Sequence, residues 1–304
     1  MHRGLVPGRT TRKDGGMTTA ADGPDQPASG NEPRHPGNAA DTPGAREFPP
    51  ALLYPPLPPV PTTRAGLAAM IDHTLLRPDA TSDDVLKVCA EAAKLGVAAV
   101  CVAPTHVFLA AASARNETNG RISAGSTDRP ASKPAYAVAS VVGFPHGNHL
   151  TAVKVEETRR AVADGATEID MVIDIANAVD ENWVAIETEI HEVRLAMPSD
   201  AVLKVILETT ILQDATIRSA CRAALAGGAE FVKTSTGFHP GGGASLRAVR
   251  AMHSAVGGRL GIKASGGIKT AAQALAFIQA GATRLGLSGT ADVLAEMPKD
   301  APSS

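Results

Sequence analysis

An α/β fold, built as a closed (β/α)8 TIM barrel, is predicted by two features of the sequence. From residue 64 onward, short apolar runs alternate eight times with amphipathic runs, and such alternation indicates parallel βα units. Four of the amphipathic runs end in a glycine just before the next apolar run, at Gly96, Gly165, Gly228 and Gly281. Glycine accepts the left-handed backbone that ends a helix, so these positions separate helix from strand. Eight such units close naturally into a barrel.

The apolar runs give the expected strands, which are Ile71–Thr74, Ala98–Ala103, Tyr136–Gly143, Glu168–Ile175, Val202–Glu208, Phe231–Thr234, Leu260–Lys263 and Arg284–Leu287. The amphipathic runs give the expected helices, which are Ser82–Leu95, Thr105–Ala114, Thr151–Asp164, Asn182–Ala196, Asp214–Ala226, Leu246–Ala255, Thr270–Gln279 and Ala291–Met297. The alternative is an open doubly wound sheet, but no G-x-G-x-x-G motif follows the first strand to support it.

The predicted barrel domain spans residues 63–298. Residues 1–62 are rich in Pro, Gly, Thr, Asp and Ala without periodicity, and such a segment buries too little apolar surface to fold. We expect a disordered N-terminal tail there, and a short disordered tail at residues 299–304. Residues 115–134 have the composition of a long surface loop between a helix and a strand.

Composition excludes several classes of function. A net charge of −2 and an aromatic content of 3% do not favour nucleic-acid partners. The three cysteines are scattered without a CxxC motif, which favours a reducing compartment. No apolar run approaches the length of about 18 residues needed to cross a membrane, and the N-terminus lacks the apolar core of a signal peptide. We therefore expect a cytoplasmic protein without membrane or nucleic-acid partners.

Charged residues interrupt the expected strands on one face only. Side chains alternate along a strand, and in 168–174 the residues Ile169, Met171 and Ile173 share an apolar face opposite Asp170. The apolar faces suit the helix layer, so the charged faces should point into the barrel near its C-terminal rim. The residues expected to converge there are Asp72, Asp170, Lys204, Lys233 and Lys263. The alternative is an ion-pair network that only organises the core, which desolvation makes costly.

Two buried lysines side by side suit one kind of chemistry. Burial and a neighbouring positive charge both lower the pKa of a lysine, so a neutral amine becomes available near neutral pH. Such an amine forms a Schiff base with an aldehyde or ketone, and the iminium permits carbon–carbon bonds to form or break at the adjacent carbon. Asp170 is the natural base for the proton on that carbon. The route needs neither metal nor cofactor, and we expect none.

Glycine-rich turns follow the last two expected strands. Residues 264–270 contain Gly266 and Gly267, and residues 285–290 contain Gly286 and Gly289. Glycine lets backbone N–H groups approach an anion, and barrels often bind phosphate after strands seven and eight. The turns therefore predict a phosphate site, with simple tight turns as the alternative.

The motifs in this region resemble those of the deoxyribose-phosphate aldolase family. The matching segments lie at 71–76, 141–147, 165–175, 203–209, 231–238 and 261–270, and the resemblance runs from about residue 66 to 297, essentially the whole predicted domain. The resemblance implies a class I aldolase, a lyase that reversibly cleaves 2-deoxy-D-ribose 5-phosphate to D-glyceraldehyde 3-phosphate and acetaldehyde. Its partners would be a phosphosugar and an aldehyde, and the resemblance leaves open a monomer or, as we expect, a homodimer.

The resemblance also implies roles for single residues. Lys233 in Val-Lys-Thr-Ser-Thr-Gly matches the Schiff-base lysine, Lys263 in Ile-Lys-Ala-Ser-Gly-Gly matches the lysine that perturbs it and helps proton transfer, and Asp170 matches the proton donor and acceptor. The implied substrate-binding residues are Asp72, Thr74, Cys101, Lys204 and Thr236, although Cys101 fits equally well as a small core residue. The implied phosphate-binding residues are Gly237, Gly266, Gly267, Gly286, Ser288 and Gly289. Gly289 departs from the Ser-Ser or Ser-Ala pair expected there, so only a backbone contact is expected from it.

Other functions remain as alternatives. Four histidines, His73, His146, His149 and His239, lie on separate loops and do not form a recognisable metal-ligand set. A phosphosugar isomerase on the same fold would need acid–base carboxylates rather than two buried lysines. A catalytically silent barrel would not need Asp170, Lys233 and Lys263 together.

Overall fold

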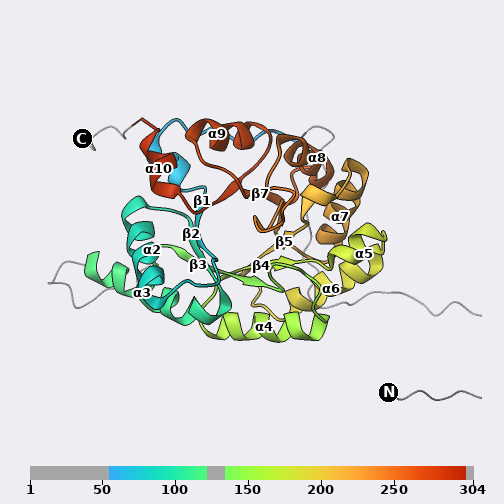
Figure 1. Ribbon diagram of the computed structural model, residues 1–304, viewed down its shortest axis with the longest axis horizontal. Helices are drawn as coiled ribbons and strands as arrows, with labels where there is room; N and C mark the ends of the chain where they lie inside the picture. Colours follow the sequence, from blue (N-terminus) through green and yellow to red (C-terminus); the bar gives the residue numbers. More distant parts are fainter. Residues whose placement is uncertain (1–54, 122–133, 299–304) are drawn as a thin grey trace, which may run out of the picture. The chain divides into compact units, whose positions relative to one another are not determined.

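The computed structural model describes residues 55–121 and 134–298. Eight parallel strands close into a barrel in sequence order, with helices outside them (Figure 1), which confirms the predicted (β/α)8 TIM barrel. The strands are β1 (Ile71–Leu75), β2 (Ala99–Val102), β3 (Ala137–Val142), β4 (Glu168–Val172), β5 (Val202–Ile206), β6 (Phe231–Lys233), β7 (Gly261–Ser265) and β8 (Arg284–Leu287).

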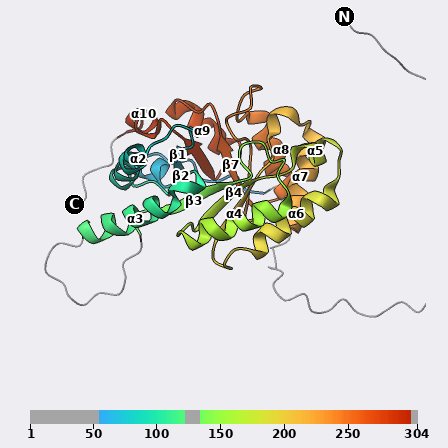
Figure 2. The same ribbon diagram turned by 60° about the horizontal axis from the view of Figure 1, so that its bottom comes forward.

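The helices form the outer layer, and in the turned view of Figure 2 α4 and α6 lie side by side below the strands. Their bounds are α1 (Arg64–Ala68), α2 (Ser82–Leu95), α3 (Val107–Arg121), α4 (Thr151–Ala163), α5 (Ile175–Val179), α6 (Trp183–Leu195), α7 (Asp214–Ala226), α8 (Leu246–Val256), α9 (Ala271–Gln279) and α10 (Thr290–Ala295). Two short 3-10 turns are η1 (Pro104–His106) and η2 (Thr209–Ile211).

Local signals set the ends of the helices. α2 begins with a capping box, in which the Thr81 hydroxyl accepts from the Asp84 N–H and the Asp84 carboxylate accepts from the Thr81 N–H. It ends at Gly96, whose φ of 71° lies in the left-handed region. Gly165, Gly228 and Gly281 also have positive φ, so all four glycines that marked helix exits in the sequence stop a helix by the expected means.

The strand register decides which side chains enter the barrel. Asp170 pairs with Lys204, and Lys233 pairs with Lys263, so these four residues share the inner face of neighbouring strands. The opposite faces of these strands are apolar and pack against the helices. Their buried side chains are Ile169, Met171, Leu203, Val205, Val232 and Ile262. Burial of each large aliphatic side chain contributes about 1.5–3 kcal/mol, so the outer layer holds the strands that carry the inward charges.

Several of the sequence-based bounds are wrong, and three of them concern the ends of α3, β4 and β5. α3 continues to Arg121 instead of ending at Ala114, because extending an existing helix by a residue costs little once its first turn has formed. The expected loop 115–134 is therefore helical in its first part. β4 ends at Val172 and Ile175 begins α5, because the Asp174 carboxylate accepts from the Ala176 N–H and caps a new helix. β5 ends at Ile206, and Glu208 takes a left-handed backbone.

The expected disordered tails and the rest of the expected surface loop lie largely outside the described ranges. These are residues 1–54 of the N-terminal tail, 122–133 of the loop and 299–304. Residues 55–62 are described and form neither helix nor strand. Within the described ranges, no helix is both long enough and apolar enough to span a bilayer.

Candidate active site

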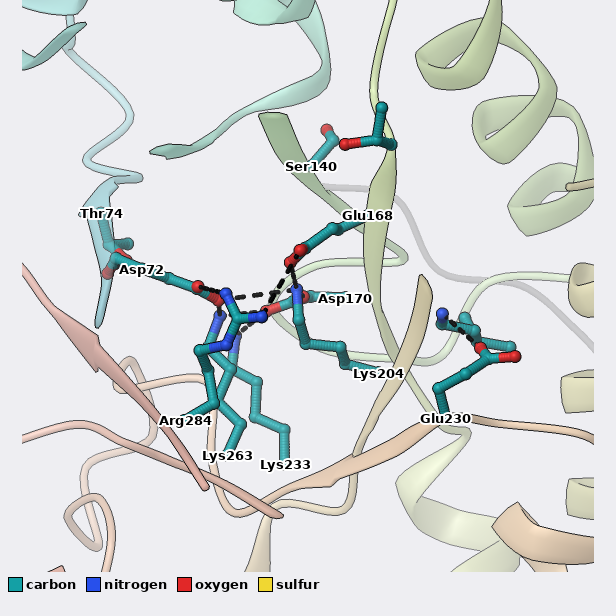
Figure 3. Close-up of polar contacts among 12 residues, drawn as sticks. Asp72, Thr74, Ser140, Glu168, Asp170, Lys204, Glu230, Lys233, Lys263 and Arg284 are labelled. Atoms are coloured by element: carbon teal, nitrogen blue, oxygen red, sulfur yellow. Dashed lines mark hydrogen bonds and ion pairs between the residues drawn. The ribbon is translucent and has the colours of Figure 1, made fainter. Parts of the chain in front are cut away.

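A cluster of charged side chains fills the inner face of the barrel (Figure 3), and Asp170 of β4 lies at its centre. Its Oδ2 atom contacts two lysines, at 2.8 Å from Lys233 Nζ and 2.7 Å from Lys263 Nζ. Its other oxygen, Oδ1, lies 2.8 Å from Lys204 Nζ. One carboxylate on β4 therefore holds three lysines that come from three successive strands, β5, β6 and β7.

Asp72 of β1 forms a second centre in the same cluster. It contacts Lys263, and its Oδ1 lies 2.7 Å from a guanidinium nitrogen of Arg284 on β8. Lys204 Nζ also lies 2.5 Å from Glu168 Oε2. Asp72, Asp170, Lys204 and Lys263 are all at most 1% exposed. The ionic network thus crosses the barrel interior from β4 and β5 to β8 and β1.

The charges of this cluster do not balance if every group is ionised. The described network contains three carboxylates, from Asp72, Glu168 and Asp170, and four cationic groups, from Lys204, Lys233, Lys263 and Arg284. An unpaired buried charge is costly, and a buried group relieves that cost by becoming neutral. One of the lysines is therefore the natural neutral member.

Lys233 is the lysine of the network whose pKa is lowered. Its burial lowers the pKa below the ordinary lysine value, and the nearby charge of Lys263 lowers it further. Asp170 acts in the opposite direction and attracts a proton to the amine, but it does not overcome these two effects. The Asp170 carboxylate also contacts Lys204 and Lys263, so its negative charge is shared among three lysines.

The neighbouring groups keep their charges. Burial alone would lower the pKa of Lys263, but the carboxylates of Asp170 and Asp72 outweigh it and raise that pKa above its ordinary value. Lys204 behaves in the same way, with its pKa raised well above the ordinary value. Burial opposes ionisation of Asp170, yet the three lysines hold its pKa well below the usual range. The site thus combines two lysines of raised pKa and a carboxylate of lowered pKa with one amine of lowered pKa.

An open cavity of about 380 Å³ lies at the C-terminal ends of the strands, next to Lys233. Eight predicted site residues line it, namely the catalytic Lys233 and the substrate- or phosphate-binding Thr74, Thr236, Gly237, Gly266, Gly267, Gly286 and Ser288. Asp170, Lys204, Lys263 and Asp72 do not line it and lie beneath it in the barrel interior. Among the three lysines of the network, only Lys233 lines this cavity, with 3% of its surface exposed.

Glycine is required where two loops meet at this cavity. Gly266 has a φ of 93°, and a Cβ atom there would lie 2.9 Å from the Gly243 Cα atom and 3.2 Å from the Gly237 Cα atom. Any side chain would therefore push the loop after β6 away from the turn after β7. Gly237 and Gly267 also have positive φ values of 83° and 81°. These turns line the cavity with backbone, as an anion site needs.

Two predicted site residues do not line the cavity. Cys101 is fully buried beside Ala99, Ala139 and Val141, yet it lies close enough to Lys263, Asp170 and Lys233 to feel their charges. Burial raises the pKa of its thiol to about 11. Gly289 also lies outside the cavity lining and directly precedes α10.

Sequence reasoning missed four polar residues at the site. Glu168 and Arg284 belong to the charged network, and their signal was the strand alternation that places them on the same inward faces as Asp170 and Gly286. Arg77 lines the cavity from the loop after β1, and Glu208 supports the loop after β6. Strand alternation places Glu208 on the same face as Lys204, whereas no motif or periodicity marks Arg77.

The described residues contain no group of three His, Cys, Asp or Glu side chains that would hold a metal ion. His73, the most buried of the four histidines weighed above, hydrogen-bonds Thr290 Oγ1 at 2.8 Å and Glu91 at 3.3 Å. It faces the helix layer and has no part in the cavity.

A parallel barrel in which a cavity-lining lysine of lowered pKa lies beside a second lysine of raised pKa and a buried carboxylate defines a class I aldolase. Enzymes of this class bind a carbonyl substrate covalently through a lysine amine.

The comparisons specify the family. Residues 67–293 match the model of the DeoC/LacD family aldolases. A deoxyribose-phosphate aldolase of Frankia alni is 69% identical over 77% of this chain and 99% of that relative, and one of Corynebacterium diphtheriae is 51% identical over 78% and 99%. The solved tetrameric deoxyribose phosphate aldolase of Aeropyrum pernix matches with a TM-score of 0.68 and 31% identity, over 78% of this chain and 92% of that one. The chain belongs to the DeoC/LacD family of aldolases.

Proposed function

We propose that the chain catalyses the reversible cleavage of 2-deoxy-D-ribose 5-phosphate to D-glyceraldehyde 3-phosphate and acetaldehyde. Several relatives of high identity carry the name of this activity. The observation that supports it most directly is the lowered pKa of Lys233, an amine that opens into a cavity next to an ionised carboxylate. The phosphate group of the sugar suits the glycine-rich turns that line the same cavity.

In this proposal Lys233 is the nucleophile. Its neutral amine attacks the C1 aldehyde of the open-chain sugar, and loss of water gives an iminium bonded to Nζ. Asp170 accepts the proton of the C3 hydroxyl, either directly or through a water molecule, as the C2–C3 bond breaks and its electrons move into the iminium. D-Glyceraldehyde 3-phosphate leaves, the remaining enamine takes a proton at C2, and water releases acetaldehyde and the free amine.

Lys263 and Lys204 have supporting roles. Lys263 stays charged, so it lowers the pKa of Lys233 and shares the Asp170 oxygen that handles the proton. Lys204 compensates the other oxygen of Asp170 and keeps this carboxylate ionised. Asp72 in turn holds Lys263 and keeps it protonated.

Trapping the imine tests the assignment of Lys233. Borohydride added with acetaldehyde should reduce the iminium to a stable ethyl adduct, and peptide mapping should place that adduct on Lys233. An adduct on another lysine, or none, would contradict the proposal. Lys94, exposed near the end of α2, serves as the unreactive reference in the same digest.

Removing Lys263 should move the pH dependence of the reaction to higher pH. The charge of Lys263 lowers the pKa of Lys233, and Asp170 raises it, so Lys263→Met leaves the raising effect less opposed. Lys233 then loses its proton only at higher pH, so the acid limb of the kcat/KM profile moves to higher pH. We also expect kcat to fall. The measurement is a pH profile of kcat/KM, with Lys87→Met on the exposed face of α2 as the control. An unshifted limb would argue that Lys263 does not act on Lys233 electrostatically.

Gly266→Ala should weaken substrate binding. The added Cβ overlaps Gly243 and requires a left-handed backbone at a non-glycine residue, so the turn after β7 must move. We expect KM for 2-deoxyribose 5-phosphate to rise about tenfold, equivalent to one misplaced hydrogen bond. Gly96→Ala is a matched control, because Gly96 also has positive φ, at 71°, but lies at the end of α2 with open space around it. It should reduce the melting temperature without changing KM.

Two expectations about partners and location stay predictions. The proposed phosphosugar and aldehyde need no other macromolecule at the cavity. The expected homodimer is tested by light scattering of the purified full chain, and the expected cytoplasmic location by fractionation of the source cells.

A further inference from the structure

Glu208 has two costly features at one position. It follows β5, and its backbone has φ 53° and ψ 58°, in the left-handed region that non-glycine residues avoid. Its side chain is 1% exposed, and one of its carboxyl oxygens, Oε1, is buried without a hydrogen-bond partner in the described part of the chain. Strain and a buried polar group at the same residue occur where surrounding contacts require them, and such positions cluster at functional sites.

The other carboxyl oxygen explains the position. Glu208 Oε2 accepts two hydrogen bonds from Thr236, one from its hydroxyl at 2.6 Å and one from its backbone N–H at 3.2 Å. The Thr236 hydroxyl in turn accepts from the Phe238 N–H at 3.1 Å. The carboxyl group of Glu208 thus holds the turn formed by residues 236–238, three residues after Lys233.

The backbone on both sides of Glu208 is clamped to β6 and its extension. The Leu207 N–H donates to the Lys233 carbonyl at 3.0 Å, and the Thr209 N–H donates to the Thr234 carbonyl at 2.8 Å. Glu208 therefore cannot relax its backbone without breaking the ladder that also carries Lys233. Its side chain reaches the turn from a fixed base.

The turn that Glu208 holds is one wall of the cavity. Thr236, Gly237 and Phe238 all line it, and Gly237 packs against Gly266 of the turn after β7 with no room for a side chain at Gly266. The Thr236 hydroxyl donates its single proton to Glu208, so it has none to donate to a substrate. Thr236 thus contributes to the cavity through the shape of the turn.

We infer that Glu208 is a positioning residue for the anion end of the cavity. It fixes the turn 236–238 against the turn of Gly266, and so sets the spacing of the backbone that surrounds the phosphate of the substrate. This inference rests on the proposed function. In the described part of the chain the Glu208 carboxylate bonds Thr236 and the Lys233 amine bonds Asp170, so the effect of Glu208 should fall on binding of the phosphorylated substrate and not on formation of the imine.

Two substitutions at Glu208 separate the hydrogen bonds from the size of the side chain. Glu208→Gln retains an oxygen that accepts from Thr236, whereas Glu208→Leu removes both acceptors and keeps an approximate volume. We expect Glu208→Leu to raise KM for 2-deoxyribose 5-phosphate about tenfold, the effect of losing an interaction of one hydrogen bond. Glu208→Gln should stay near the wild-type KM. Glu192→Leu, at an exposed position of α6, is the matched control and should change neither parameter.

The second measurement is borohydride trapping with acetaldehyde, which carries no phosphate. Glu208→Leu should trap at Lys233 at the wild-type rate, although its KM for the phosphorylated sugar is raised. An unchanged KM, or an equal loss in both measurements, would overturn the positioning role. Absence of trapping in the wild-type enzyme would instead contradict the proposed function itself.

Thr236→Val tests the same contact from the other side and guards against a misfolded Glu208 variant. It removes the hydroxyl and preserves the branched shape of the side chain. If the two residues act as one unit, Thr236→Val raises KM. The double variant with Glu208→Leu then has a KM increase smaller than the product of the two single increases. Independent effects that multiply would contradict the inference.

Discussion

Lys233→Ala is expected to abolish aldol cleavage while leaving the fold intact. The substitution removes the proposed nucleophile, and loss of a covalent catalytic group commonly lowers kcat by about 10⁴-fold or more. The three carboxylates of the cluster then face Lys204, Lys263 and Arg284, which balances their charges. The variant should therefore unfold at nearly the wild-type temperature.

The measurements are the rate of 2-deoxyribose 5-phosphate cleavage and a thermal melt. Lys94→Ala, an exposed lysine at the end of α2, should retain full activity. If Lys233→Ala also retained activity, a mechanism without a lysine imine, such as that of an isomerase, would replace the present one. If the variant were inactive and also melted at a much lower temperature, Lys233 would have a structural role. The charge balance of the cluster argues against that outcome.

Asp170→Asn is expected to reduce both activity and stability. The amide cannot accept a proton as the carboxylate does, and loss of a general base lowers rates by about 10²–10⁴-fold. It also leaves Lys204 and Lys263 with fewer counter-charges in a buried site, and breaking such a buried pair costs about 3–5 kcal/mol. A loss of both activity and stability distinguishes Asp170→Asn from Lys233→Ala, for which only activity should be lost.

Asp170→Asn also has an expected pH signature. Asp170 raises the pKa of Lys233, so its loss should let this lysine lose its proton at lower pH and shift the acid limb of the residual activity downward. This shift is opposite in sign to the one expected for Lys263→Met. The control is Asp83→Asn, at an exposed position in the first turn of α2. Denaturant unfolding and a pH profile of kcat/KM provide the two readouts.

Strand periodicity predicted a large part of the site. It placed Asp72, Asp170, Lys204, Lys233 and Lys263 on inward faces, and the structure brings all five into one network. This works because alternation is a property of the backbone, so a single charged residue in an apolar strand reveals its face. Residues after the strands were less predictable. Glu208 was expected to be in a strand, and only its contact with Thr236, which comes from the neighbouring loop, explains its backbone.

The sequence by itself determined the fold, the inward charges and the glycine turns, because these depend on periodicity and on the conformations that single residues allow. Only the tertiary structure decided which lysine has the lowered pKa. Lys233 and Lys263 occupy paired positions on adjacent strands and both contact Asp170. Their difference comes from Asp72, which contacts Lys263 across the barrel from β1 and raises its pKa, and which has no such contact with Lys233. A proton distributes according to the charges within a few ångströms, and residues far apart in the chain supply those charges.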